Sequence, residues 1–291
     1  MDILVDDSKK IEAKEIGFNS TLMNTVYPYH RHIFLVYKNV ENWVPTIRKA
    51  YRDSLPGFLD AALDSHADKT PINTQMTICE GPDGTGSSDG DVFVFPDMVK
   101  YRGLTNNTSG KFVSGSVERL EGSYVFVCSN GGPDMFGYYG PEIINRFKEE
   151  IELRGMEDQV FVSPCSHVGG RWFIGNLMIF SRSPTGEVTG HWYACATTDD
   201  VPAFLDQHIA KGDIIKKLWR GRMLPFPTED IQRVIEEKPV EIVGTTFTSG
   251  SVLEKGEKEE SQARTEVGDM VKDEEAFPVE NANKSKKPRF I

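Results

Sequence analysis

The stretch Tyr124–Gly155, which reads YVFVCSNGGPDMFGYYGPEIINRFKEEIELRG, carries the strongest fold signal in the chain. Its first part, Tyr124–Cys128, is an apolar run of the length of a β-strand. After a glycine-rich loop, Pro141–Arg154 places its isoleucines and Phe147 at helical spacing, with most of its glutamates off that face. A proline suits the first helical turn, and Gly155 suits a helix stop. The stretch therefore predicts a strand, a loop and a helix over Pro141–Arg154.

The same order of elements is expected twice in the chain. The first copy is predicted to contain strand Ile33–Tyr37, one or two helices within Glu41–Ser65, and strands Gln75–Cys79 and Asp91–Phe95. The second is predicted to contain strand Tyr124–Cys128, helix Pro141–Arg154, strands Gln159–Val162, Asn176–Phe180 and Trp192–Ala196, and a closing helix Asp199–Ile209 capped by Asp199. This order predicts an α/β fold of thioredoxin-like type, built as two related thioredoxin-like halves.

Composition excludes several classes of protein. The chain has 291 residues, enough for one large domain or two ordinary ones. Its net charge of −11 argues against nucleic acid or an anionic membrane as the main partner. The longest apolar runs are of strand length, well short of the ~20 residues of a membrane helix. The acidic N-terminal residues fit neither a secretory signal nor a transit peptide, so we expect a cytoplasmic protein.

The four cysteines, Cys79, Cys128, Cys165 and Cys195, are widely spaced. This spacing does not suit a small disulfide scaffold. The lack of a CxxC pair among them means that neither a zinc ribbon nor a dithiol redox centre is predicted from the sequence. A reducing, intracellular compartment is the simplest interpretation.

Composition also divides the chain into segments. We expect an N-terminal arm over residues 1–27, one half of the fold over residues 28–120, the other over residues 121–223, and a disordered acidic tail over residues 224–291. The tail contains the basic cluster Lys284–Arg289. This cluster is either a nuclear-import or docking signal or simply solvated charge, so a nuclear location stays open.

Three loops could carry chemistry. The loop Gly81–Asp91 lacks the lysine of a phosphate loop and the spacing of a calcium loop, so we expect a long turn between strands. Cys128 ends a strand before a helix, whose dipole would favour a thiolate; the alternative is a buried cysteine that caps the strand. His167 follows a strand within a glycine-flanked loop, a better place for a metal ligand than an apolar helix face.

A set of longer motifs extends over about residues 28–223. They are Arg31–Leu35, Thr77–Gly81, Ser88–Val92, Phe95–Leu104, Tyr124–Cys128, Phe147–Ile151, Cys165–Gly169, Gly175–Leu177, Asp199–Pro202, Leu205–Gly212 and Leu218–Gly221. Together they resemble the sucrase/ferredoxin-like proteins of plants and fungi, the plant members most of all. The resemblance implies a thioredoxin-like ferredoxin module over residues 121–223.

In that family the module is thought to hold a 2Fe–2S cluster through two cysteines and two histidines spaced four apart. Carried over to this chain, the retained ligand positions are Cys128 and His167. The other two positions fall on Phe136 and Arg171, neither of which can ligate iron. The matching segment near the end of the fold places Arg220 at the rim of the cluster pocket or opposite a carboxylate.

The resemblance implies a redox or electron-transfer lineage, and the lost positions favour a cluster-free binding or regulatory module that has a protein partner and no cofactor. The alternative is a 2Fe–2S electron-transfer protein with a redox partner, in which Cys165 or Cys195 substitutes beside Cys128 and His167. A third hypothesis is thiol peroxidase or reductase activity at Cys128, although no resolving cysteine lies at CxxC distance. Sucrose hydrolysis is not expected, because no acidic motif predicts a carboxylate pair.

Overall fold

The computed structural model describes residues 22–43, 53–67, 70–81, 88–106, 112–129, 135–166, 168, 173–183 and 185–226, with only the backbone of residues 42 and 135–138. All of them belong to the unit Met1–Ser251, which the contacts of the chain separate from Val252–Ile291. Residues 227–291 of the predicted disordered tail lie outside the described residues. Among the helices described, none is both long and apolar enough to cross a membrane.

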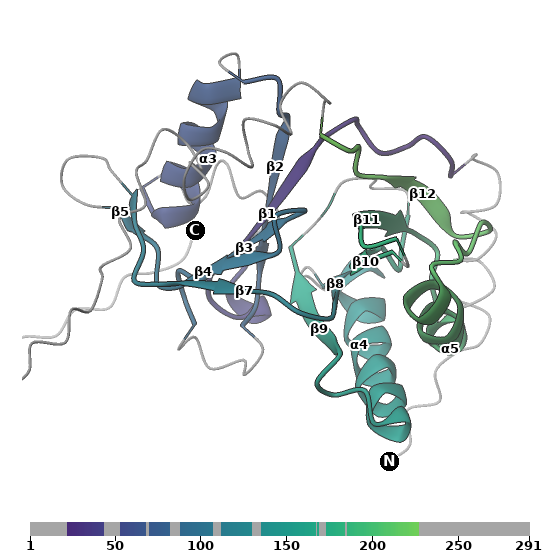
Figure 1. Cartoon of the computed structure of the whole chain (residues 1–291). Coiled ribbons are helices and arrows are strands. Elements are labelled where there is room, and N and C mark those ends of the chain that lie inside the picture. The colour runs from purple at the N-terminus through teal and green to yellow at the C-terminus, as the bar shows by residue number, and fades with distance from the viewer. Residues whose placement is uncertain are drawn as a thin grey trace, which may run out of the picture. The chain divides into compact units, whose positions relative to one another are not determined.

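Ten strands of the described chain form one sheet, in the order β12-β11-β10-β8-β9-β2-β1-β3-β4-β7 (Figure 1). They are β1 (Arg31–Val36), β2 (Thr74–Cys79), β3 (Val92–Phe95), β4 (Val99–Tyr101), β7 (Val117–Arg119), β8 (Ser123–Cys128), β9 (Val160–Cys165), β10 (Leu177–Arg182), β11 (Val188–Tyr193) and β12 (Trp219–Arg222). A small second sheet pairs β5 (Thr105–Asn106) with β6 (Phe112–Val113). The helical elements are η1 (Val40–Asn42), α3 (Leu55–His66), α4 (Met135–Arg154), η3 (Thr198–Asp200), α5 (Val201–Ala203) and η4 (Phe204–Ile209).

The strand order repeats one plan in two halves. In the second half, the parallel strands β8 and β9 are joined through α4, and β10 and β11 follow as antiparallel strands on the other side of β8. In the first half, β1 and β2 are parallel and joined through α3, and β3 and β4 follow on the other side of β1. Parallel neighbours need such a crossover connection. The predicted α/β class, with two related thioredoxin-like halves, is thereby confirmed.

Within the residues that the structure describes, the two halves join edge to edge through a single residue pair, Cys79 of β2 and Cys165 of β9. Two backbone hydrogen bonds flank this pair, and in each the residue after one cysteine donates to the carbonyl of the residue before the other, at 3.1 and 2.8 Å. An approximate twofold axis therefore passes between the cysteines and relates the halves. It makes Val36 the counterpart of Cys128, because Val36 is in register with Cys79 as Cys128 is with Cys165.

The sheet folds over at this joint, so that the two halves pack face to face. In a flat sheet, three strand spacings of about 4.8 Å would separate β1 from β8. Instead, Phe34 of β1 stacks on Phe126 of β8 with the ring centroids 3.6 Å apart. Phe95 of β3 stacks in the same way on Phe180 of β10, at 4.4 Å. Apolar side chains from both halves therefore form one continuous inner core between the two layers of strands.

Helices cover the outer face of each half, on opposite sides of the strands (Figure 1). Ile33 and Leu35 of β1 pack in one cluster with Leu59 of α3. The alternate residues of β8 pack with Phe147 of α4 and Phe204 of η4 in a separate cluster. Because side chains alternate along a strand, each central strand contributes to the inner core with one face and to a helix-covered outer core with the other.

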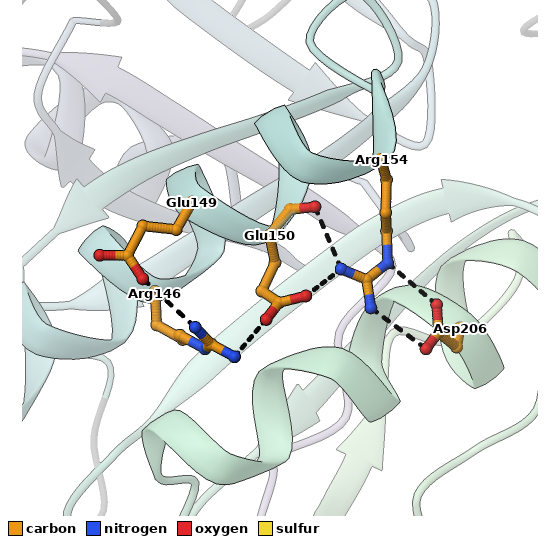
Figure 2. Close-up of polar contacts among 5 residues, drawn as sticks. All are labelled: Arg146, Glu149, Glu150, Arg154 and Asp206. Carbon is orange, nitrogen blue, oxygen red and sulfur yellow. Dashed lines mark hydrogen bonds and ion pairs between the residues drawn. The ribbon is translucent and has the colours of Figure 1, made fainter.

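A charge network links α4 to η4 on this outer side (Figure 2). Glu150 is 6% exposed and lies between Arg146 and Arg154, one helical turn away on either side. Arg154 also donates to both carboxylate oxygens of Asp206, at 3.1 and 3.2 Å. Arg146 reaches the exposed Glu149 at 3.3 Å. The network fixes the end of α4 against the irregular helix that closes the fold.

Helix α4 starts earlier than the sequence predicts. It begins at Met135, so Pro141 lies inside the helix rather than in its first turn. The proline removes one backbone donor, and the remaining hydrogen bonds continue the helix across it. The predicted stop is confirmed: Gly155 has a φ of 61°, and its N–H donates to the Glu152 carbonyl at 3.0 Å. A left-handed glycine in this position is typical of a helix C-terminus.

The closing helix departs from the prediction in two respects. It is a 3₁₀ turn followed by a short α-helix and a π-helix, not one regular helix over Asp199–Ile209. Its cap is Thr197 rather than Asp199, because the Asp200 carboxylate accepts hydrogen bonds from the N–H and the hydroxyl of Thr197, each at 3.0 Å. Lys217 also binds this carboxylate at 2.7 Å.

The residues before β1 lie along β12. The Thr25 N–H donates to the Arg220 carbonyl at 3.3 Å, and the Leu224 N–H donates to the Tyr29 carbonyl at 2.8 Å. The Tyr29 hydroxyl accepts a hydrogen bond from the indole of Trp192 at 2.6 Å within the buried core. The N-terminal part of the described chain therefore closes the side of the second half on which the candidate site lies.

Candidate cofactor site at the end of strand β8

Cys128 is the last residue of β8, where the strand meets the N-terminal part of α4. Its side chain is buried in the inner core, with 3% of the residue exposed. Its N–H donates to the Asn176 carbonyl at 2.9 Å, and the next N–H, of Ser129, donates to the Cys165 carbonyl at 2.9 Å. Helix α4 approaches closely here, because a Cβ on Gly140 would overlap Ser129 and the Cys128 carbonyl. A glycine is therefore required for the helix to pack on the end of this strand.

Cys165 stands beside Cys128 on the neighbouring strand, and Cys79 stands beside Cys165 on the next. The residues are in register across β8, β9 and β2, and all three side chains belong to the inner core. We call these three cysteines the thiol row. Burial raises the pKa of Cys165 well above its usual value, and the nearby Cys128 and Cys79 raise it further. Burial likewise raises the pKa of Cys79, so both thiols stay protonated at neutral pH.

A buried arginine forms the polar side of the site. Arg220 of β12 is 3% exposed and donates from Nη1 to the side-chain oxygen of Asn176 at 2.7 Å. Its Nε donates to the Thr25 hydroxyl at 3.1 Å. The guanidinium also lies over the rings of Phe173 and Trp192, 5.1 and 5.7 Å from their centroids. Burial lowers the pKa of Arg220, and the nearby Cys195 and Cys128 thiols partly oppose this shift.

Cys195, the other proposed substitute ligand, packs differently. It lies in the loop after β11 with a φ of 56°, and its side chain contacts the outer core covered by α4 rather than the inner core of the thiol row. Its N–H donates to the Ile174 carbonyl at 2.7 Å. Burial raises the pKa of its thiol, and Arg220 counteracts this shift. Of the two proposed substitutes, only Cys165 shares a core with Cys128.

The other predicted ligand positions lie at or beyond the edge of what the structure describes. Phe136 is in the first turn of α4, and its backbone alone is described. His167 and Arg171 lie outside the described residues. Within the described part of the chain, no three His, Cys, Asp or Glu side chains are grouped to hold a metal ion. The donor set carried over from the family does not fit a complete cluster, because phenylalanine and arginine offer no ligand atom to iron.

The end of β1, which is the equivalent of the end of β8, carries an apolar residue in place of the cysteine. Val36 stands where the second half has Cys128, and Asp91 stands where it has Asn176, since each accepts a backbone hydrogen bond from the last residue of the first strand. The Asp91 carboxylate binds Lys100 at 2.9 Å and Arg102 at 2.8 Å. This ion group, in which Asp91 and Lys100 are buried and Arg102 is partly exposed, anchors the far end of the loop after β2. The structure confirms that this loop connects β2 to β3, and residues 82–87 within it lie outside the described residues.

Sequence reasoning missed the juxtaposition of the three cysteines and the role of Asn176. Cys79, Cys128 and Cys165 are far apart in sequence, and only the pairing of β8, β9 and β2 brings them together. One signal could have suggested it: Cys79 and Cys165 each end the second strand of a repeated strand–helix–strand unit. Aligning the two units would have placed both cysteines at one level of the sheet.

The sequence is similar to known proteins. The model of the family described as sucrase/ferredoxin-like matches residues 22–221. Altered inheritance of mitochondria protein 32 from Debaryomyces hansenii is 30% identical over 100 residues, which are 34% of this chain and 35% of that protein. A 2Fe-2S ferredoxin from Clostridium pasteurianum is 31% identical over 103 residues, which are 33% of this chain and 92% of that protein. The match thus spans about a third of the length of the yeast relative.

Among solved structures, a thioredoxin-like [2Fe-2S] ferredoxin from Aquifex aeolicus is similar to part of the chain. The similarity has a TM-score of 0.30 and 18% sequence identity. It covers 36% of this chain and 96% of that one.

Proposed function

The chain belongs to the sucrase/ferredoxin-like family, and from this membership we propose that it is a cluster-free binding or regulatory module of a redox lineage. The observation that carries the proposal is the position of Phe136. It lies in the first turn of α4, and the resemblance to the family assigns the second cluster cysteine to this position. A phenylalanine side chain has no atom that can replace a thiolate there.

The number of ligands at the site supports the same proposal. A 2Fe–2S cluster takes two ligands on each iron, and this chain retains only Cys128 and His167 of the expected four. Arg171, at the remaining position, is a permanent cation with no acceptor atom. The packing around Cys128 supports the proposal: Gly140 brings α4 directly onto the end of β8, and the Cys128 side chain faces the inner core.

The direct test is iron analysis of the full chain, purified anaerobically, together with its visible absorption spectrum. The proposal expects a colourless protein without stoichiometric iron. A brown protein whose iron content and absorption match a bound 2Fe–2S cluster would refute it. The matched control is the double variant Phe136→Cys with Arg171→His, which restores the family's ligand set. Cluster uptake by this variant alone would show that the two substitutions account for the loss.

The second candidate function is electron transfer through a cluster that uses Cys128, His167 and a substitute ligand. One observation favours it: Cys165 is the in-register neighbour of Cys128, and both side chains lie in the same core. Its test is the Cys165→Ser variant of an iron-containing preparation. Loss of iron on this substitution, with Cys195→Ser retaining it, would support Cys165 as the substitute ligand. Equal iron in both variants would exclude it.

We propose further that the module acts on a protein partner in the cytoplasm. The net charge of −11 disfavours nucleic acid and anionic lipid as partners. Fractionation of cells that express the tagged full chain tests the location, with a variant in which the lysines of Lys284–Arg289 are replaced by serine as the control for nuclear import. A signal confined to another compartment would contradict the proposal.

A further inference from the structure

The thiol row places two cysteines on the axis that relates the two halves. Cys79 and Cys165 are the single residue pair through which β2 and β9 meet, and both are fully buried in the inner core. Two thiols at a junction between related halves, directly opposite each other, are the arrangement needed for a cross-strand disulfide. This arrangement does not depend on whether the neighbouring site holds a cluster.

The hydrogen-bond pattern at the joint defines the geometry of the pair. The Glu80 N–H donates to the Pro164 carbonyl, and the Ser166 N–H donates to the Ile78 carbonyl. The bonds are therefore made by the residues on either side of the cysteines, and the cysteines form a non-hydrogen-bonded antiparallel pair. In such pairs the Cα atoms are about 4.5 Å apart and the side chains are at their closest. Disulfides span Cα separations of about 4.4–6.8 Å, so the pair can close with little backbone movement.

The same reasoning separates this pair from the other neighbours in the row. Cys128 and Cys165 are also in register, but they lie on parallel strands, where the hydrogen bonds are evenly spaced and no pair is brought closer than the rest. The β8–β9 ladder runs over six residue pairs, whereas β2 and β9 meet at one. The β2–β9 joint can therefore adjust and open locally more easily than the long ladder beside it.

We propose that Cys79 and Cys165 form a cross-strand disulfide when the protein meets hydrogen peroxide. Local opening of the joint admits water and the peroxide and removes the burial that keeps the thiols protonated. The Cys165 thiolate then attacks one peroxide oxygen, and the proton of the thiol passes to the oxygen that leaves. The O–O bond breaks, water leaves, and a sulfenic acid forms. The Cys79 sulfur then attacks that sulfur, the S–S bond forms, the S–O bond breaks, and a second water leaves. In total the two thiols lose two electrons and two protons, and one peroxide is reduced to two waters.

The disulfide would tether the two halves at the one place where strands of both halves pair edge to edge within the described chain. It closes a loop that includes β3, β8 and α4, so it restricts the unfolded chain strongly. Oxidation should therefore raise the midpoint of thermal unfolding, by about 5–15 °C for a unit of this size. This disulfide-bonded state of the joint does not depend on the cluster site. The disulfide proposal and the proposed cluster-free function can therefore be refuted separately.

The test is peptide mapping of the full chain before and after treatment with hydrogen peroxide. Free thiols are alkylated under denaturing conditions, the chain is digested without reduction, and linked peptides are identified by mass spectrometry. The expected product is one linked pair containing Cys79 and Cys165, with Cys195 alkylated, and the link disappears on reduction. A link between Cys128 and Cys165 as the main product, or continued alkylation of all four cysteines, would overturn the proposal.

Variants separate the pair from its neighbour. Cys128→Ser leaves the Cys79–Cys165 link intact, and Cys79→Ser abolishes both the link and the rise in the unfolding midpoint caused by peroxide. If Cys79→Ser does not fold, the mapping of the unsubstituted chain still decides the question. A rise in the unfolding midpoint of equal size in Cys79→Ser would show that peroxide acts elsewhere and would refute the tether.

Discussion

Phe34 and Phe126 occupy equivalent positions in the two halves, each two residues before the end of the first strand of its half, and their rings stack across the interface. The centroids are 3.6 Å apart and the ring planes differ by 7°. Phe95 and Phe180 repeat this relation at 4.4 Å. Each stack contains one ring from each half, so neither half has a complete core without the other. The halves should therefore fold and unfold together.

Replacement of Phe126 by alanine tests this dependence. The substitution empties the centre of the inner core and should lower the free energy of unfolding by about 3–5 kcal/mol. Phe34→Ala should cost a similar amount, and the double variant should cost less than the sum, because both remove the same stack. Denaturant unfolding followed by tryptophan fluorescence measures all three.

Leu153→Ala is the control for this series, because Leu153 is 77% exposed on α4 and should change stability little. The unsubstituted protein should unfold in a single transition. Two separate transitions, one for each half, would contradict the shared core.

The elements within each half could be predicted from local sequence, because each depends on a local pattern. Strand runs such as Tyr124–Cys128 and the helical spacing of α4 predict the parallel pairs, and the crossover rule then gives the strand order of each half. The start of α4 could not be predicted in this way. Glycines and aromatic residues in Met135–Gly140 are weak helix formers, and tertiary packing on the end of β8 overrides that preference.

The face-to-face packing of the halves had no comparable local signal. It depends on one residue pair between strands that are far apart in sequence, Cys79 and Cys165, and on aromatic side chains whose partners lie in the other half. The candidate site likewise combines a residue that local sequence predicts with a contact that depends on the tertiary fold. Cys128 could be predicted as a site residue from its strand–loop–helix context, whereas the contact of Arg220 with Asn176 arises only when β12 closes the second half.

Replacement of Gly175 by alanine should destabilise the fold through both backbone strain and steric overlap. Gly155→Ala separates the two effects. Gly175 has a φ of 58°, and a Cβ at this position would overlap the carbonyl of Ala196. Gly155 has a similar φ of 61°, yet nothing lies within 4 Å of the position of its Cβ. Gly155→Ala should therefore cost about 1–2 kcal/mol for the left-handed backbone alone. Gly175→Ala should add about 1–3 kcal/mol for the steric overlap.

Thermal and denaturant unfolding of the two variants give this comparison directly. Because Gly175 precedes Asn176, whose side chain binds Arg220, Gly175→Ala should also change the near-ultraviolet signal of the nearby Trp192. Equal losses of stability in the two variants would show that the contact with Ala196 relaxes without cost.

Glu150 and Glu149 are adjacent on α4 but should respond differently to substitution. Glu150 is 6% exposed and lies between Arg146 and Arg154, as Figure 2 shows, whereas Glu149 has a side chain that is 63% exposed. Glu150→Ala removes a buried carboxylate that two arginines share, and it should cost about 1–3 kcal/mol. Glu149→Ala should cost less than about 0.5 kcal/mol. Unfolding at low and high salt measures both, and equal costs would exclude a structural role for the network.

Three buried histidines predict a loss of stability on acidification. Burial lowers the pKa of His32 and His208 to about 3 and that of His191 to about 4, from a usual value near 6.5. Above about pH 6.5 the three are neutral in both the folded and the unfolded chain, so they contribute no pH dependence. As the pH falls from about 6.5 towards 4, the unfolded chain binds their protons first, and the free energy of unfolding decreases.

Each such histidine contributes a slope of up to about 1.4 kcal/mol per pH unit in this window. The His208→Gln variant should nevertheless lose stability at pH 8, because Nδ1 of the ring forms a hydrogen bond with the Tyr193 hydroxyl at 2.7 Å within the buried outer core. Between pH 6.5 and 4, however, its stability should fall less steeply than that of the unsubstituted protein, since one titrating group has been removed. Measurement at pH 8 separates the packing effect from the titration. An unchanged slope in the variant would mean that His208 already takes up its proton in the folded protein.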